Sequence, residues 1–286
     1  MELTVLSANI AFGLREMDKP WRNFFAHLGI HGWRLIPLLI AGRTTTTFFD
    51  LSKGRYPERT EFFKDYSDLS AIVAVIEEEK PDIVVLNELL YRIHKHELET
   101  WLREDGFTHF AWGRSAHHKS YYGKRDMTMA TVVASKLPID RTFIPDIPQK
   151  AQPGGGGGIS GIRLADEPVT IIGLHLSIYD KGLWKKQIKK LSRIVQEEKA
   201  LGRKVILAGD WNATSQQIFS YPEFKGLKMR TLDAAKRPTC PTFSRANFPA
   251  VKQIDHIIAA EETYVKDFSL GDFGSDHRWI SATMKI

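Results

Sequence analysis

The chain has 286 residues, 43% of them apolar, and carries a formal net charge of +6. That size suits one large domain or two small ones, and the apolar share provides a sizeable core. The single cysteine, Cys240, excludes an intrachain disulfide and a zinc site built from cysteines. The basic balance weakly favours polyanionic partners such as nucleic acid, anionic lipid headgroups or phosphorylated small molecules.

Alternating apolar residues at the start of the chain predict a first strand over residues 3–10, with Leu3 and Val5 directed inward and Leu6 as a further candidate. An acidic second residue followed at once by a strand differs from the basic start and apolar middle of a signal peptide. The longest apolar stretch, LGIHGWRLIPLLIAG, is shorter than the roughly 20 residues that span a bilayer, and it contains Arg34 and Pro37. We therefore expect a cytoplasmic protein.

The segment at residues 15–66 is rich in Trp, Phe and Tyr. Its large apolar residues fall on one helical face, which core packing explains. The alternative is an exposed aromatic patch at a membrane interface, with Arg22 and Arg34 near anionic groups. The residues of this face are Trp21, Phe24, Phe25, Leu28, Leu35, Ile36 and Leu39.

Helices and strands alternate along the rest of the chain. Apolar spacing predicts a helix over residues 67–80, capped by Ser67 or Asp68 and stopped by Pro81. A second amphipathic helix, LWKKQIKKLSRIVQEEKALG, ends at Gly202. Strands are expected at PDIVVLNELL, MATVVASKLPI, VTIIGLHLSIY, KVILAGDWN, QIDHIIAA and RWISATMKI. Strand pairs mixed with strand–helix–strand units predict an α/β sandwich instead of a purely parallel sheet.

Polar side chains stand where several of these strands begin or end. Burying such groups without partners costs several kcal/mol each, so they are expected to converge at one edge of a sheet. A divalent metal and a bound phosphate would satisfy them together, and oxygen ligands suit Mg²⁺ or Mn²⁺. The residues are Asn9, Glu88, His175, Asp210, Asn212, Asp255 and His277.

Each of these residues also has an ordinary explanation. Asp210 and Asn212 suit a turn. Glu88 could mark the exposed end of its strand, and His175 could be a core histidine with a satisfied hydrogen bond. The combination of all of them is harder to explain without a catalytic site.

The order of the pieces SANI, DIVVLNE, GLHLS, LAGDWNAT, PTF, IDHI and SDHRW resembles the endonuclease/exonuclease/phosphatase superfamily, the deoxyribonuclease-I-like fold. GDWN and SDH are the most specific pieces. The match covers essentially the whole chain, so we expect a single such domain over residues 1–286, with an aromatic-rich insertion at about 15–66. The resemblance implies an α/β fold with four layers, in which two packed mixed β-sheets are flanked by helices.

The resemblance also implies hydrolysis of a phosphoester with one or two divalent metals. It makes Glu88 the main metal ligand, supported by Asn9 and Asp276. Asp210 would orient or deprotonate the attacking water, and Asn212 would hold a phosphate oxygen or a second metal.

The resemblance assigns roles to the histidines as well. His277 would contact the scissile phosphate, with Asp255 fixing and charging its imidazole. His175 would donate a hydrogen bond or a proton to a phosphoryl oxygen.

Two positions depart from the family pattern. Many members carry Gly-Asn where this chain has Ala130-Thr131, so an amide contact to the phosphate is either lost or supplied by Thr131. His256 replaces the usual aromatic residue or Asn after Asp255, and strand alternation directs it away from Asp255.

Fold alone does not choose the substrate. The first hypothesis is a Mg²⁺-dependent nuclease or nucleic-acid phosphodiesterase, and the alternative is a phospholipid or phosphoinositide hydrolase that uses the aromatic insertion at an anionic membrane surface. A catalytically inactive binding module is disfavoured by the complete set of polar residues, and no obligate protein partner is inferred. Basic residues of the second helix could contact backbone phosphates or form a solvated outer face. They are Lys185, Lys186, Lys189, Lys190 and Arg193.

Overall fold

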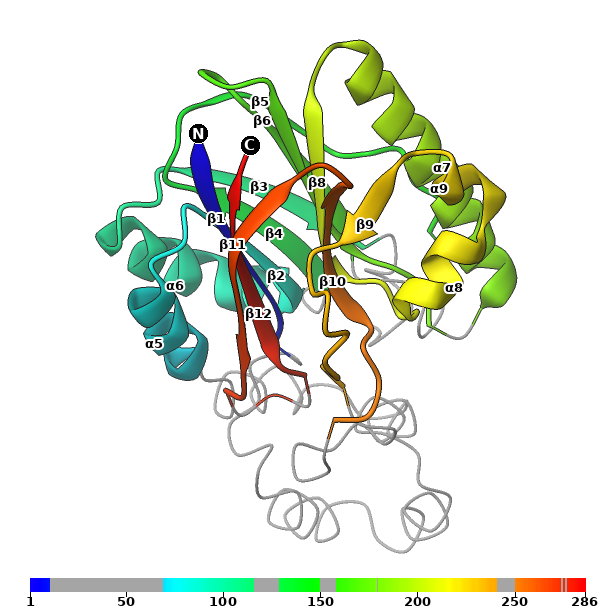
Figure 1. The fold of residues 1–286 in the computed structure, drawn as a ribbon. Coiled ribbons are helices and arrows are strands. Elements are labelled where there is room, and N and C mark those ends of the chain that lie inside the picture. Colours follow the sequence, from blue (N-terminus) through cyan, green and yellow to red (C-terminus); the bar gives the residue numbers. More distant parts are fainter. Residues whose placement is uncertain are drawn as a thin grey trace, which may run out of the picture.

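The computed structural model describes residues 1–10, 69–115, 129–149, 158–178, 180–240, 250–273, 275 and 277–286. These residues form two β-sheets packed face to face, with helices on both outer sides (Figure 1). The aromatic-rich insertion expected at about 15–66 lies outside the described residues, and so does Asp276.

The first sheet has the strand order β11-β12-β1-β2-β4-β3. β1 and β2 run parallel, and their register pairs Asn9 with Asn87. This pairing brings the polar ends of two strands side by side, although residues 10–82 separate the strands in the chain. In sheet order, the bounds are Tyr264–Gly271, Trp279–Lys285, Glu2–Asn9, Ile83–Leu90, Met129–Ser135 and His109–Arg114.

The second sheet has the strand order β5-β6-β7-β8-β10-β9. β7 and β8 are parallel, with His175 opposite Asp210, and β8 and β10 are antiparallel, with Asp255 opposite Asp210. The register therefore aligns these three polar residues in one row at the end of the sheet. In sheet order, the bounds are Ile139–Phe143, Gly158–Leu164, Val169–His175, Lys204–Asp210, Asp255–Ala260 and Met229–Thr231.

Three apolar clusters hold the four layers together. One lies between the sheets, a second joins α5 and α6 to the first sheet, and a third joins α7, α8 and α9 to the second sheet. Alternation along β1 explains the layering, because Leu3 packs between the sheets while Leu6 packs toward the helices. The helices are Ser70–Glu79, Tyr91–Glu104, Lys181–Ala200, Ser215–Ser220 and Pro222–Lys225. The four-layer sandwich expected from the sequence is confirmed.

Some local predictions differ from the structure. α5 begins at Ser70, and its N-cap position is Leu69 instead of Ser67 or Asp68. The apolar patterns missed α6, β6 and all four edge strands, β3, β5, β9 and β11. An edge strand exposes more of its surface, so the regular alternation that marks an interior strand is weak there. None of the described helices is long and apolar enough to cross a bilayer.

His94 supports the junction between β2 and α6. Its side chain is fully buried, and its Nδ1 accepts a hydrogen bond from the backbone N–H of Leu90 at 2.9 Å. Burial lowers the pKa of His94 to about 3. The folded chain therefore keeps this imidazole neutral at pH values where the unfolded chain protonates it.

We expect acid to destabilise the fold through His94. The folded-state pKa of His94 lies below the unfolded value, so its contribution to the free energy of unfolding is complete above about pH 6.5. That contribution falls by ~1.36 kcal/mol per pH unit as the pH drops toward about 3. Urea titrations should show that the free energy of unfolding falls by about 2 kcal/mol through His94 between about pH 7.5 and about pH 5. In His94→Gln, whose amide oxygen can still accept from Leu90, that part of the pH dependence should vanish. An unchanged pH dependence in this variant would contradict the assignment.

Candidate active site

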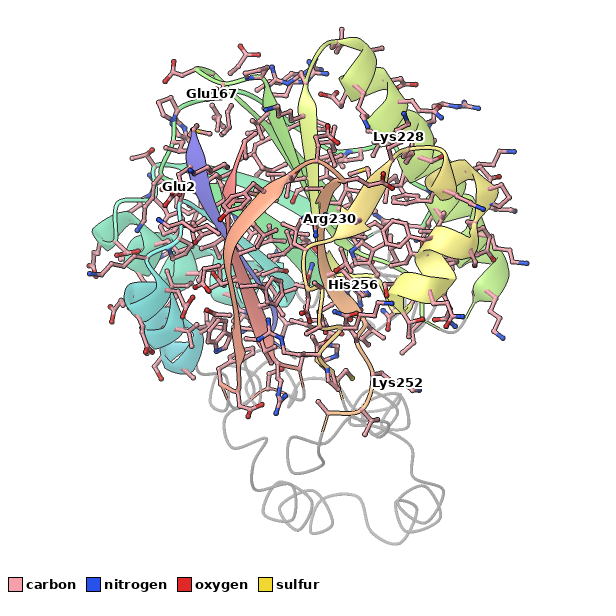
Figure 2. The ribbon with its side chains drawn as sticks, in the orientation of Figure 1. Glu2, Glu167, Lys228, Arg230, Lys252 and His256 are labelled. Carbon is pink, nitrogen blue, oxygen red and sulfur yellow. The ribbon has the colours of Figure 1, made fainter. Side chains whose placement is uncertain are left out.

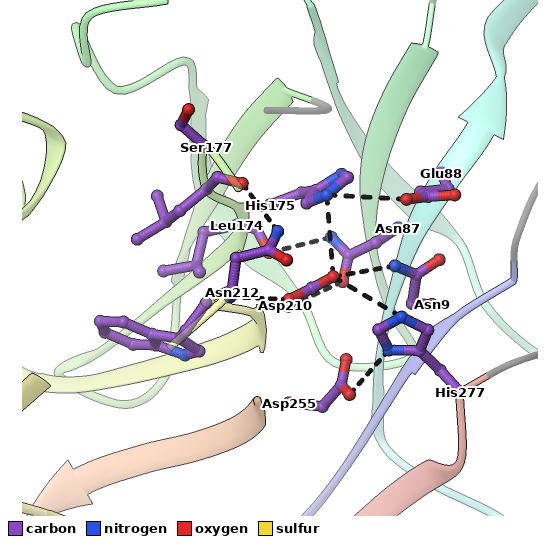
Figure 3. Close-up of polar contacts among 12 residues, drawn as sticks. Asn9, Asn87, Glu88, Leu174, His175, Ser177, Asp210, Asn212, Asp255 and His277 are labelled. Atoms are coloured by element: carbon purple, nitrogen blue, oxygen red, sulfur yellow. Dashed lines mark hydrogen bonds and ion pairs between the residues drawn. The ribbon is translucent and has the colours of Figure 1, made fainter. Parts of the chain in front are cut away.

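The polar ends of the strands meet at one end of the sandwich, between the two sheets (Figure 3). These side chains come from six separate segments of the chain, with Asp210 and Asn212 on the same one, and β1, β2, β7, β8 and β10 all contribute. The side chains are those of Asn9, Glu88, His175, Asp210, Asn212, Asp255 and His277.

Asp210 occupies the centre of this cluster. Asn9 Nδ2 donates to Asp210 Oδ2 at 3.0 Å, and the backbone N–H of Asn212 donates to Asp210 Oδ1 at 2.8 Å. Burial, reinforced by the charge of Asp255, raises the pKa of Asp210 to about 7. A carboxyl group with that pKa exchanges protons near neutral pH, as a general base must.

Gly209 and Asn87 allow β8 to bring Asp210 to this position. Gly209 has φ 138°, and a Cβ there would lie 2.0 Å from the carbonyl oxygen of Leu174. Asn87 Oδ1 accepts from the Asp210 backbone N–H at 3.3 Å, while Asn87 Nδ2 donates to the Leu174 carbonyl at 3.0 Å. Asn87 therefore ties the first sheet to the second. Asn87 was not among the predicted site residues, although an amide within a continuously apolar strand was an available signal.

Asp255 and His277 form a close ion pair. His277 Nδ1 donates to Asp255 Oδ2 at 2.8 Å, and the hydroxyl of Thr239 donates to the same oxygen at 2.7 Å. Burial opposes protonation of His277, but Asp255 and Cys240 outweigh it and raise the pKa of His277 well above its usual value. The imidazole is therefore cationic at neutral pH, with Nε2 4.0 Å from Asp210 Oδ2.

Three residues around this pair were missed as site residues: Thr239, Cys240 and Ser275. The Ser275 hydroxyl donates to the Asn9 carbonyl at 2.7 Å and accepts from the His277 backbone N–H at 3.2 Å. Ser275 and Asn9 are 266 residues apart in the chain. Contacts over such separations leave no local pattern in the sequence around either residue.

His175 lies between two carboxylates. Its Nε2 is 3.7 Å from Glu88 Oε1 and 3.7 Å from Asp210 Oδ2, and both distances are too long for hydrogen bonds. Burial lowers the pKa of His175 to about 3, so the imidazole is neutral. Glu88 takes a left-handed backbone at φ 57°, where the pairing of β2 with β4 shifts register. Such irregularities redirect a side chain out of the ordinary strand alternation.

These side chains fit a divalent cation. One ligand atom each from Glu88, His175 and Asp210 lies within 4.8 Å of the other two, and the same holds for Asp210, Asp255 and His277. Two ligands of one Mg²⁺ ion lie at most about 4.2 Å apart, so the observed 3.7 Å spacing is compatible. Among the described residues, four buried side-chain atoms have no hydrogen-bond partner, and two of them, His175 Nδ1 and Asp255 Oδ1, belong to this cluster. A set of buried acids with unsatisfied polar atoms is what a bound cation would stabilise.

Three further residues were expected at the site: Asn212, Thr131 and Asp276. Asn212 adopts φ 50° and donates from Nδ2 to the Leu176 carbonyl at 2.9 Å, which holds it beside Asp210. Thr131 is fully buried, and its hydroxyl donates to the Gly158 carbonyl at 3.0 Å. The Thr131 hydroxyl also accepts from Asn87 Nδ2 at 2.9 Å, and its contact with a phosphate stays a prediction. Asp276 lies outside the described residues.

His256 points away from Asp255, as strand alternation predicts, and lies on β10 on the side of α8 (Figure 2). Burial lowers the pKa of His256, and its Nε2 donates to the Ala213 carbonyl at 2.9 Å. Trp184, on α7, donates from Nε1 to the carbonyl of Trp211 in the same loop at 2.8 Å. These two contacts fix the loop that follows Asp210.

The sequence profile of the Endonuclease/Exonuclease/phosphatase family matches residues 59–277. This is most of the chain, and the chain belongs to that family. Endonucleases, exonucleases and phosphatases all hydrolyse phosphoesters, so the family makes this protein a phosphoester hydrolase.

Solved structures share the fold at low sequence identity. An endonuclease/exonuclease/phosphatase from Beutenbergia cavernae is 20% identical, with 100% of this chain and 72% of that chain covered and a TM-score of 0.64. A family protein from Leptotrichia buccalis is 14% identical, with coverage of 99% and 100% and a TM-score of 0.62. TDP2 from D. rerio, complexed with a single-strand DNA product, is 14% identical, with coverage of 100% and 99% and a TM-score of 0.56. The comparison with curated proteins finds no match.

We expect His256→Leu to lower kcat for phosphodiester hydrolysis about tenfold or more, with KM nearly unchanged. The substitution leaves the Ala213 carbonyl without its donor and loosens the loop that carries Asn212. His256→Gln keeps a donor and should retain most of the activity. Steady-state kinetics on bis-p-nitrophenyl phosphate, with thermal melting to verify folding, provide the measurement. Full kcat in a folded His256→Leu protein would show that the loop does not need this bond.

Proposed function

We propose that the protein is a divalent-metal-dependent phosphodiesterase that acts on nucleic acid. The main support is the contrast between two buried groups that face each other. Burial raises the pKa of Asp210 to about 7, whereas Asp255 keeps His277 cationic 4.0 Å away. A base and a fixed positive charge at one site are what hydrolysis of a phosphodiester requires.

Glu88 would hold the metal, together with Asn9 and Asp276, the ligands that the family resemblance implies. A carboxylate oxygen of Asp210 lies within 4.8 Å of one of Glu88, so Asp210 borders the place where the ion would bind. Carboxylate and amide oxygens favour Mg²⁺ or Mn²⁺ over softer metals. When bound, the ion would supply positive charge that polarises a phosphoryl oxygen.

Asp210 would accept the proton of the attacking water. Its donors, Asn9 Nδ2 and the Asn212 backbone N–H, hold the carboxylate in one orientation. His277 would stabilise the negative charge that develops on the phosphoryl oxygens, because Asp255 occupies Nδ1 and leaves the Nε2 proton directed into the site. Phosphoryl transfer depends mainly on such positioning and charge stabilisation.

His175 and Asn212 would orient the phosphate. The neutral imidazole of His175 would donate from Nε2, which lies between Glu88 and Asp210, to a phosphoryl oxygen. Asn212 uses one amide N–H for the Leu176 carbonyl, so its second N–H can serve another phosphoryl oxygen.

The net charge of +6 and the family's nuclease members support nucleic acid as the substrate. The D. rerio TDP2 structure, which contains a single-strand DNA product, supports it as well. The alternative of a phospholipid hydrolase depends on the aromatic-rich insertion, which lies outside the described residues.

A substrate panel tests this proposal. We expect the protein to cleave DNA or RNA strands with Mg²⁺ or Mn²⁺ and to lose this activity in EDTA. Sphingomyelin and phosphoinositides should be poor substrates in the same assay. Hydrolysis of the lipids alone would replace the nucleic-acid proposal. Inactivity on every substrate, including bis-p-nitrophenyl phosphate, would overturn the proposed chemistry.

Single substitutions test the assigned roles. Asp210→Asn removes the base and His277→Gln removes the positive charge, so each should lower kcat about a hundredfold or more. His96→Ala and Asp166→Asn change exposed residues of the same types and should leave kcat within about twofold. Initial rates on a labelled oligonucleotide measure the effect, with thermal melting to verify folding. Wild-type rates in either site variant would refute its role.

A further inference from the structure

One face of α7 carries a line of basic residues that we call the α7 basic stripe: Lys181, Lys185, Lys189 and Arg193. They recur every four residues, so they lie along one side of the helix, and all four are exposed. Lys186 and Lys190 lie next to the stripe, and residues 181–193 contain no Asp or Glu. The opposite face of α7 packs against the second sheet through residues such as Leu191.

Helix stability does not explain the α7 basic stripe. The N-terminal end of a helix carries partial positive charge, so Lys181 in the first turn is unfavourable there. Like charges four residues apart also repel each other, as Lys185 and Lys189 do. The N-cap residue Asp180 accepts from the Leu183 backbone N–H at 2.8 Å, but the first turn itself contains no acidic residue. The sequence thus keeps positive charges at positions where they weaken the helix.

The stripe residues also lack acidic partners within the described part of the chain. Many other basic residues there are paired, and Lys190, beside the stripe, pairs with Asp146 at 3.1 Å. Further pairs are Lys136 with Asp105, Arg163 with Glu198, Arg237 with Asp233 and Lys266 with Glu2. The α7 basic stripe therefore offers uncompensated positive charge to a polyanion.

The N-terminal end of α7, where the stripe begins, is attached to the loop that follows Asp210. Trp184, in the first turns of α7, donates to the carbonyl of Trp211, which lies between Asp210 and Asn212. The side chain of Gln187 accepts from the Ser177 backbone N–H at 2.9 Å. Figure 1 shows α7 running along the outside of the second sheet, away from the site end. The stripe covers about 18 Å of the helix axis at 1.5 Å per residue.

We propose that the α7 basic stripe binds the phosphate backbone of a nucleic-acid strand beyond the scissile bond. This inference rests on the proposed function and extends the substrate contacts from one phosphate to several. Point charges about 6 Å apart along a helix contact phosphates without reading bases. Binding through the stripe should therefore be independent of sequence and strongly dependent on salt.

Equilibrium binding tests the proposal without requiring hydrolysis. The ligand is a fluorescein-labelled oligothymidylate of roughly 20 nucleotides, longer than most single-strand binding sites. Anisotropy is measured in EDTA from about 50 to about 200 mM KCl. The stripe variant combines Lys185→Gln, Lys189→Gln and Arg193→Gln, because Gln has a helix propensity close to those of Lys and Arg.

A matched control combines Arg141→Gln, Lys204→Gln and Lys285→Gln. It removes the same charge from exposed positions on β5, β8 and β12. Comparing the two variants separates a local contact from the effect of net charge, and thermal melting verifies that both are folded.

We expect the stripe variant to bind about tenfold more weakly than the wild type at about 50 mM KCl. Its slope of log K against log salt should be shallower by about 2, because each single-strand phosphate contact contributes about 0.7. The control should change affinity by less than about twofold. Equal affinities of stripe variant and control would overturn the proposal, as would failure of the wild type to bind the strand. Failure of the proposed function would instead appear as absence of metal-dependent cleavage by a protein that binds.

Discussion

The burial of one carboxylate, that of Asp210, is the constraint on which the rest of the site depends. Asp210 is 2% exposed, and a buried charge is tolerated only when donors and opposite charges surround it. Asn9 and the backbone N–H of Asn212 donate to it, and cationic His277 lies 4.0 Å away. Because these partners come from both sheets, the contacts that stabilise Asp210 also join the two sheets at this end. Asn87 reinforces the connection from the strand beside Asn9.

Four buried histidines show how local contacts decide protonation. Burial lowers the pKa values of His94, His175 and His256, so these imidazoles are neutral. His94 uses its neutral ring to hold the β2–α6 junction, and His256 uses its own to hold the loop after Asp210. His277 is equally buried, yet the carboxylate of Asp255 at 2.8 Å raises its pKa. The carboxylate contact of His277 thus separates a cationic imidazole from three neutral ones.

α7 is connected to the site through packing and hydrogen bonds at both of its ends. Near its N-terminus, Trp184 holds the loop after Asp210. Near its C-terminus, Glu198 accepts from Thr170 at 2.7 Å and pairs with Arg163. Because both ends are attached to the second sheet, the outward face of the helix has a defined direction relative to the catalytic groups. Charge on that face can therefore guide a long substrate even though it touches no reacting atom.

The sequence by itself determined the interior strands and the polar residues at their ends. Apolar runs marked β2 and β8, and Glu88 and Asp210 stood out because they interrupt those runs in an order that matched a known family. Only the tertiary structure decided the edge strands, whose exposure weakens the apolar pattern, and the supporting residues Asn87 and Thr239. It also decided that the Thr131 hydroxyl is used inside the protein. The physical reason is that hydrogen bonds between segments far apart in the chain leave no periodic trace in the sequence around either partner.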